Sequence, residues 1–173
     1  VFEYVYFARP DSYIKGKCAY EYRKNFGYEL AKESDEVGDI VVPVPDSGNA
    51  AAIGYSQHEK INFDLGLIRN HYVGRTFIEP SQNIRSLGVK LKLSPTKSIV
   101  KNKSIILIDD SLVRGTTCLK IVKMLYEAGA KEVHVRIACP EIKFPDFYGV
   151  DMPTKKELLA FQKTNDEMCQ YIK

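Results

Sequence analysis

The amino-acid sequence predicts an α/β fold in which a mostly parallel, twisted sheet is flanked by helices. Short apolar runs alternate with helical patterns along the chain, which is typical of strand–helix–strand units around a parallel sheet. The length of 173 residues fits a single domain, so we expect one domain over residues 1–173. Hydrophobic residues make up 45% and charged residues 27%, which argues against a disordered or fibrous chain.

The apolar and helical patterns place the expected elements. We expect buried strands at residues 40–44, 63–68, 105–108 and 133–138. We expect helices at residues 12–32, at 50–55, from 116 to a C-terminal cap at Gly129, at 154–157 and at 166–171. Asp11 or Ser12 would cap the first helix, and the residues before it form a strand-like apolar segment. The segment between Ile68 and Ser104 has no clean period, and loops of that length are usually functional or disordered.

Composition excludes several classes of protein. No apolar run approaches the roughly 18 residues of a spanning helix, so we expect no membrane segment and a cytoplasmic location. The net charge of +3 is too small to indicate a nucleic-acid partner. The four cysteines form no C-x-x-C pair, which disfavours a zinc knuckle or a disulfide scaffold and indicates buried or idle thiols: Cys18, Cys118, Cys139 and Cys169.

The strongest signal for a site is the segment 105–117. Its apolar strand delivers Asp109 and Asp110 to the carboxyl end, which is where open α/β sheets bind their ligands. The loop that follows combines Gly115 with three hydroxyls, on Ser111, Thr116 and Thr117, and with the amides that open a helix. Such a loop suits a phosphate, and adjacent carboxylates suit a hard cation or the hydroxyls of a sugar. A simple helix cap explains any one of these residues but not the whole run.

A second turn follows the neighbouring strand. Asp46, Ser47 and Gly48 succeed Val44-Pro45, and a turn with Gly48 can direct backbone amides at an anion. Alone, this stretch is typical of an ordinary β-turn. Its pairing with the Asp109–Asp110 strand makes a binding role the better interpretation.

The segment 105–117 resembles the phosphoribosylpyrophosphate (PRPP) binding motif of type I phosphoribosyltransferases. The ending Ser-Leu-Val-Arg-Gly-Thr-Thr at 111–117 is similar to that of the glutamine PRPP amidotransferase family, which acts in purine biosynthesis. Residues 2–12, 72–77 and 148–153 support this narrower match, so the resemblance covers nearly the whole chain. It implies the type I phosphoribosyltransferase fold, with a flexible loop at the active site.

The resemblance also implies roles for individual residues. PRPP would be bound by two groups of residues: Asp46, Ser47 and Gly48 in the first turn, and Asp109, Asp110, Ser111, Val113, Arg114, Gly115, Thr116 and Thr117 in the second. Mg²⁺ would be held by Ser47, Asp109 and Asp110. Tyr72, Arg75 and Lys92 match the catalytic stretch, in which Arg75 and Lys92 would contact pyrophosphate. Six basic residues and no acid lie between Pro80 and Ile108, so their charge is concentrated there: Arg85, Lys90, Lys92, Lys97, Lys101 and Lys103.

The implied reaction is displacement of pyrophosphate at C1 of PRPP by ammonia, which gives 5-phosphoribosylamine. In this family the ammonia comes from glutamine, released by a glutaminase domain with an N-terminal cysteine; this chain begins with Val1, so we expect that domain to be absent from it. Purine nucleotides are possible feedback inhibitors, and the family habit is a homo-oligomer. Two alternatives stay open: a purine-base salvage phosphoribosyltransferase, with Phe144, Phe147 or Tyr148 stacking on the base, and a non-catalytic module that binds PRPP or a nucleotide.

Overall fold

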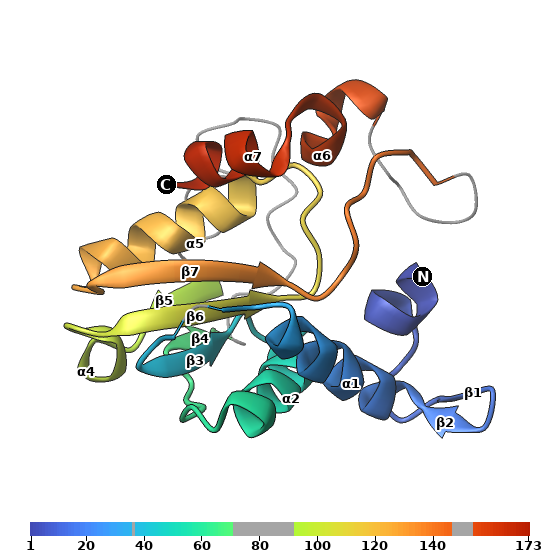
Figure 1. Ribbon diagram of the computed structural model, residues 1–173, viewed down its shortest axis with the longest axis horizontal. Coiled ribbons are helices and arrows are strands. Elements are labelled where there is room, and N and C mark those ends of the chain that lie inside the picture. Colours follow the sequence, from blue (N-terminus) through green and yellow to red (C-terminus); the bar gives the residue numbers. More distant parts are fainter. Residues whose placement is uncertain (36, 71–91, 147–153) are drawn as a thin grey trace.

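The centre of the fold is a parallel sheet that matches the predicted one. The structure is a computed structural model and describes residues 1–35, 37–70, 92–146 and 154–173. Strands β3 (Ile40–Pro43), β6 (Ser104–Asp109) and β7 (Glu132–Ile137) lie in that order and run parallel (Figure 1). The expected strands at 40–44, 105–108 and 133–138 are therefore confirmed to within a residue or two.

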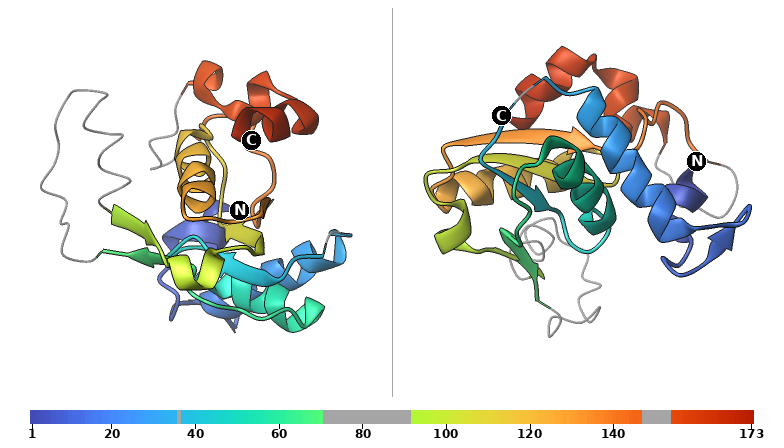
Figure 2. Two further views of the ribbon diagram at one scale, coloured as in Figure 1. Left: turned by 90° about the vertical axis from the view of Figure 1, so that its left-hand side faces the viewer. Right: turned by 60° about the horizontal axis from the view of Figure 1, so that its bottom comes forward.

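Strand β6 is buried on both faces because helices cover the sheet from both sides. Ile105 and Leu107 pack in the cluster that includes Ile121 of α5 (Thr116–Glu127) and Met168 of α7 (Asn165–Ile172). Ile106 and Ile108 pack on the opposite face, under α1 (Ala19–Lys32) and α2 (Asn49–Glu59). Figures 1 and 2 show the resulting three layers, with the sheet in the middle. This double burial explains why the strand is an unbroken apolar run.

Helices α1 and α2 approach each other at two glycines. A Cβ atom at Gly27 would lie 1.8 Å from the carbonyl oxygen of Ala51, and one at Gly54 would lie 1.9 Å from the carbonyl oxygen of Lys24. The two helices can therefore pack at this distance only with hydrogen in place of a side chain at both positions.

The first long helix begins later than the sequence predicts. Residues 13–18 form a hairpin of β1 (Tyr13–Ile14) and β2 (Lys17–Cys18), because Lys15 and Gly16 adopt positive φ angles of 49° and 79° in its turn. Asp11 or Ser12 is therefore not the cap. Cys18 is, and its amide donates to the Glu21 carboxylate at 3.2 Å.

The expected strand at 63–68 is wrong as a single element. Phe63 makes an isolated parallel bridge with Val41, whereas β4 (Leu67–Arg69) pairs antiparallel with β5 (Leu93–Pro95). A tight turn separates the two, in which the amide of Gly66 donates to the carbonyl of Asp64 at 3.0 Å. The apolar pattern continues through this turn, which is why the sequence suggested one strand.

The chain begins with a short π-helical turn, η1 (Glu3–Phe7), where the sequence suggested a strand. The buried guanidinium of Arg23 on α1 donates to the carbonyl oxygens of Tyr4 at 2.9 Å and Ala8 at 2.6 Å, which fixes this turn against the domain. The remaining elements are α4 (Lys97–Val100), η2 (Lys155–Glu157) and α6 (Leu159–Gln162). Among the residues described, no helix is long and apolar enough to span a bilayer.

Replacing Gly54 with alanine tests the helix contact. An alanine in an open helix normally stabilises by about 1 kcal/mol relative to glycine. Here the methyl group would meet backbone 1.9 Å away, so we expect Gly54→Ala to lower the free energy of unfolding by about 2 kcal/mol or more in urea titrations. The matched control is Gln57→Ala, at an exposed position of the same helix, which should change stability by less than about 0.5 kcal/mol. A stabilised Gly54→Ala protein would contradict the close packing.

Candidate functional site

The two turns predicted to bind ligand meet at one edge of the sheet. The amide of Val44, just after β3, donates to the carbonyl of Ile108 in β6 at 2.8 Å, so the turn that follows lies beside Asp109. A Cβ at Gly48 would stand 2.5 Å from that same Ile108 oxygen, so the turn fits here only with glycine at this position. The carboxyl ends of β3 and β6 thus bring together residues 46–48 and 109–117.

Asp109 and Asp110 are buried, with only 9% and 8% of their surfaces exposed. The amide of Asp110 donates to Oδ1 of Asp109 at 2.8 Å. Burial raises the pKa of Asp109 well above its ordinary value, and the neighbouring charge of Asp110 raises it further. Oδ2 of Asp110 is buried and has no hydrogen-bond partner in the part of the chain that the structure describes. A carboxylate oxygen in that state calls for a cation or a donor from beyond the described residues.

The buried cation Arg23 interacts electrostatically with Asp110. Burial lowers the pKa of Arg23, and the charges of Asp110 and of Glu3 oppose this effect. The guanidinium is held by backbone carbonyls of the N-terminal turn, which fix the position of its charge. Sequence reasoning missed Arg23, because an arginine in the middle of a helix gives no sign of the partner that its side chain reaches.

The loop between Asp110 and α5 has the features of a phosphate cradle. Gly115 starts the helix with a φ of +74°, and the hydroxyl-bearing Thr116 and Thr117 of the first turn are exposed. Residues from the C-terminal helices support the loop from behind: the amide of Leu159 donates to the carbonyl of Val113 at 2.9 Å. A Cβ on Gly115 would lie 2.7 Å from a Leu159 methyl group, so the loop has no room for a larger residue there.

Two ion pairs frame the site, and the sequence analysis missed one residue of each. Nε of Arg114 donates to Oε2 of Glu157 at 2.8 Å, and Nη1 of Arg69 donates to Oδ2 of Asp46 at 2.7 Å. Arg69 is the last residue of β4, immediately before the stretch that carries the family resemblance. The sequence did contain a signal for Arg69, because it is a basic residue at the end of an apolar stretch and precedes the matched segment. It contained none for Glu157, which is 43 residues away from Arg114.

The structure places only some of the predicted cations near this edge. Lys92 is exposed and accepts, through its carbonyl, a hydrogen bond from the amide of Asn70 at 2.8 Å, so it lies next to Arg69 at the end of the β4–β5 ribbon. Tyr72 and Arg75 lie outside the described residues. Lys101 and Lys103 precede the amino end of β6, opposite Asp109 (Figure 1), so the predicted concentration of basic charge is not one patch at the site.

The donor set fits a hard divalent cation. Mg²⁺ prefers oxygen ligands and is usually bound by one or two carboxylates together with water and substrate oxygens. The unpartnered Oδ2 of Asp110, the Asp109 carboxylate and the hydroxyl of Ser47 stand at the same edge, and a second unpartnered buried oxygen, Oδ1 of Asn49, is adjacent in sequence to Gly48. No group of three or more His, Cys, Asp or Glu side chains that could hold a metal occurs within the described residues.

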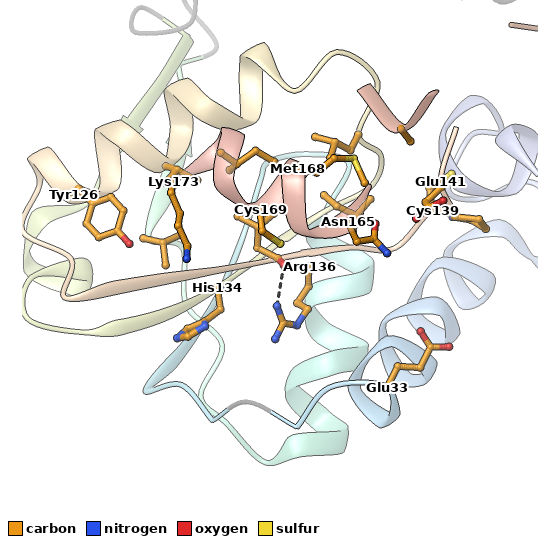
Figure 3. A pocket seen from close by; sticks show the side chains of 18 residues that line it. Glu33, Tyr126, His134, Arg136, Cys139, Glu141, Asn165, Met168, Cys169 and Lys173 are labelled. Carbon is orange, nitrogen blue, oxygen red and sulfur yellow. Dashed lines mark hydrogen bonds between the residues drawn. The ribbon is translucent and has the colours of Figure 1, made fainter. Parts of the chain in front are cut away.

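A separate groove lies away from this edge of the sheet. This groove, of about 590 Å³, follows the outer side of β7 beneath α7, with Tyr126, Met168 and Cys169 among its lining residues (Figure 3). On the other side of β7, Nε of Arg136 donates to Oγ of Ser34 at 2.9 Å, and Val133 and Val135 belong to the apolar side. This lining has neither paired carboxylates nor a glycine-started helix. Chemistry therefore favours the edge at Asp109 and Asp110, whatever the size of the groove.

Comparison with known proteins agrees with this assignment. No family model matches the sequence. The chain is 59% identical over 173 residues to an amidophosphoribosyltransferase of Rhizobium etli and 57% identical over 172 residues to that of Methanocaldococcus jannaschii. In each case the match covers 99% of this chain but only 35% and 36% of the relative, so the chain spans about a third of their length.

Solved structures give the same result. A structure described as the allosteric regulatory enzyme of purine biosynthesis superposes with a TM-score of 0.89 at 52% identity, covering 99% of this chain and 37% of the other. The glutamine PRPP amidotransferase of B. subtilis, solved with ADP and GMP, superposes with a TM-score of 0.89 at 51% identity, covering 99% of this chain and 38% of the other.

The parallel sheet with paired aspartates at the end of its central strand is the type I phosphoribosyltransferase fold. Identities above 50% over 99% of the chain narrow the assignment from this fold to a single family. The chain belongs to the amidophosphoribosyltransferase family and corresponds to about a third of the length of the relatives that it matches.

The buried carboxylate pair predicts a pH-dependent stability difference. Because the pKa of Asp109 is raised in the folded state, the folded protein keeps a proton that the unfolded chain loses, and stability falls as pH rises from about 4 up to the raised pKa. In the absence of metal, the Asp109→Asn protein should have the same free energy of unfolding as the wild type at the acid end of this pH range. At neutral pH it should be about 1 to 2 kcal/mol more stable, measured by urea unfolding in EDTA. Asp35→Asn, at an exposed carboxylate, should show no such divergence.

The thiols should differ sharply in reactivity. Burial, with the charge of Asp109, raises the pKa of Cys118 to about 12, whereas Cys169 is exposed. Because the thiolate is the reactive form, iodoacetamide at pH 8 should alkylate Cys169 first and leave Cys118 unmodified in the folded protein, as read by peptide mass spectrometry. Rapid labelling of Cys118 under native conditions would contradict the packing of α5 on the sheet.

Proposed function

We propose that this chain forms the PRPP site of an amidophosphoribosyltransferase and joins ammonia nitrogen to C1 of PRPP in the first step of de novo purine synthesis. The observation that carries the proposal is the buried Asp109–Asp110 pair, with an unpartnered oxygen, between two glycine-containing turns. The strong similarity to amidophosphoribosyltransferases supports it.

Each part of PRPP has a matching partner. The 5-phosphate is assigned to the loop 111–117, which offers the amides that open α5, the hydroxyls of Ser111, Thr116 and Thr117, and the Arg114 guanidinium. The ribose hydroxyls donate to the carboxylates of Asp109 and Asp110. Pyrophosphate binds at the turn Asp46, Ser47 and Gly48. The two turns are joined through the Val44–Ile108 hydrogen bond, so the ends of the substrate are held in a fixed relation.

Asp109, Asp110 and Ser47 would hold Mg²⁺ between these groups, and the bound cation would neutralise charge on the pyrophosphate. The chain's own contribution is to keep both carboxylates buried and oriented: the amide of Asp110 fixes the Asp109 side chain, and burial leaves Oδ2 of Asp110 free of competing protein donors within the described residues.

The reaction needs no protein nucleophile. The lone pair of neutral ammonia forms the C1–N bond as the C1–O bond breaks, its electron pair leaves with pyrophosphate, and the nitrogen then loses a proton to solvent or to pyrophosphate. The chain's task is to stabilise the charge that develops on the leaving group, and we assign this to Lys92 and Arg75, with Tyr72 in the same stretch. Water must be excluded, because it would hydrolyse PRPP.

The wider setting of the activity follows the relatives. In the complete protein we expect glutamine to supply the ammonia through a glutaminase domain, and purine nucleotides to inhibit, in keeping with a B. subtilis relative solved with ADP and GMP. We also expect a homo-oligomer. For salvage of a purine base, the aromatic candidate within the described residues is Phe144, which is 66% exposed and whose ring centre lies 4.7 Å from the Lys155 ammonium.

Product formation with different nitrogen donors tests the proposal. With PRPP and Mg²⁺, ammonium salts should support phosphoribosylamine formation, whereas glutamine should support it only in a protein that includes the glutaminase domain. Asp110→Asn should reduce the rate with ammonia by about 100-fold, because it removes one charge from the buried pair. Asp166→Asn, at an exposed carboxylate of α7, serves as the matched control and should keep full activity.

Three outcomes would contradict this proposal. Transfer of phosphoribose to hypoxanthine or adenine in place of ammonia would establish the salvage reaction. Tight PRPP binding with no turnover would indicate a binding module. Full activity in Asp110→Asn would place the reaction at another site.

A further inference from the structure

The ion pair between Arg69 and Asp46 joins the pyrophosphate turn to the ribbon that leads into segment 71–91. Nη1 of Arg69 lies 2.7 Å from Oδ2 of Asp46, although 23 residues separate the two in sequence. Arg69 ends β4, and its cross-strand partner in β5 is Leu93, which directly follows Lys92. The bond from the amide of Asn70 to the carbonyl of Lys92 then closes the ribbon. Arg69 and Lys92 are therefore two cations at the same ribbon end, beside the turn.

This pair is poorly explained as a structural contact. The Arg69 and Asp46 side chains are 51% and 54% exposed, and pairs so accessible to water contribute about 0 to 1 kcal/mol to stability. Arg23, by contrast, is buried and bonded to two backbone carbonyls. The Arg69 guanidinium also retains donors beyond the Nη1 bond to Asp46, and a guanidinium matches phosphate oxygens in a bidentate manner.

The carboxylate of Asp46 is itself a poor ligand for an anion. Placed in a turn that receives pyrophosphate, it repels the substrate unless a cation neutralises it. The Arg69–Asp46 pair resolves this conflict: the carboxylate holds the guanidinium at the turn while the site is empty. A diphosphate, with higher charge and more acceptor oxygens, then competes for the same donors.

We propose that Arg69 is a pyrophosphate-binding residue and that Asp46 holds its guanidinium in place until the pyrophosphate of the substrate takes it over. This inference rests on the proposed function and adds to it a contact that the sequence analysis did not include. It also assigns separate roles within the turn: backbone and hydroxyl groups bind, and the Asp46 side chain positions Arg69.

Binding of inorganic pyrophosphate in the presence of Mg²⁺, measured by calorimetry on the same protein, tests the inference, with ribose 5-phosphate as the reference ligand. Arg69→Ala should weaken pyrophosphate binding by about 10- to 100-fold, as expected for losing hydrogen bonds to a charged group. It should leave the affinity for ribose 5-phosphate unchanged. Arg69→Lys should bind pyrophosphate with an affinity between those of the wild type and Arg69→Ala, because it keeps the charge and loses the bidentate geometry.

Asp46→Asn separates the two roles. It should strengthen pyrophosphate binding by up to about fivefold, because the guanidinium no longer has to leave a carboxylate. In the double variant, Arg69→Ala with Asp46→Asn, this gain should vanish. Lys32→Ala, which removes the exposed Lys32–Glu29 pair on α1, is the matched control and should bind both ligands normally. Thermal midpoints of all variants should stay within about 4 °C of the wild type.

The outcomes separate this inference from the function beneath it. If the wild type binds both ligands and Arg69→Ala still binds pyrophosphate normally, Arg69 does not bind pyrophosphate. The inference then fails, and the proposed function stands. If Asp46→Asn weakens pyrophosphate binding as much as Arg69→Ala does, the pair serves to shape the turn and the inference also fails. If the wild type binds neither ligand, the proposed function fails and the inference with it.

Discussion

The candidate site depends on two carboxylates that stay buried at the end of β6, a strand with apolar neighbours on both faces. A charged group in that position costs free energy, and the raised pKa of Asp109 reflects the cost. Three features hold the pair there nonetheless: β6 is covered on both faces, its register with β3 and β7 is continuous, and the amide of Asp110 donates to Asp109. Stability is given up at this edge, where Oδ2 of Asp110 has no hydrogen-bond partner among the described residues.

Much of this arrangement was predictable from local pattern. Double burial makes β3 and β6 continuous apolar runs, and the residues after them are polar because they end at the sheet edge. The family resemblance placed Asp109, Asp110 and the loop to Thr117 in one site, and the structure brings residues 46–48 to the same edge. The roles of these residues stay predictions, as do those of Tyr72 and Arg75.

What the sequence did not predict has a common physical origin. The hairpin at 13–18 and the break at Gly66 depend on single backbone conformations, which periodicity does not register. Arg69, Glu157 and Arg23 act through partners 23, 43 and 15 to 19 residues away, and a single sequence contains no signal for such pairings. The basic residues from 80 to 108 are neighbours in the sequence, but Lys101 and Lys103 come just before β6. They therefore lie at its amino end, whereas Asp109 lies at its carboxyl end.

The β4–β5 ribbon has one more consequence, which concerns chain entropy. Its three residue pairs and the Asn70–Lys92 bond fix the two points between which residues 71–91 must run. The entropic cost of closing such a connection grows only with the logarithm of its length, so doubling the length adds about 0.6 kcal/mol. Closure between Asn70 and Lys92 therefore costs nearly the same free energy whatever length of flexible chain joins them. The ribbon keeps these two ends beside the turn at Asp46.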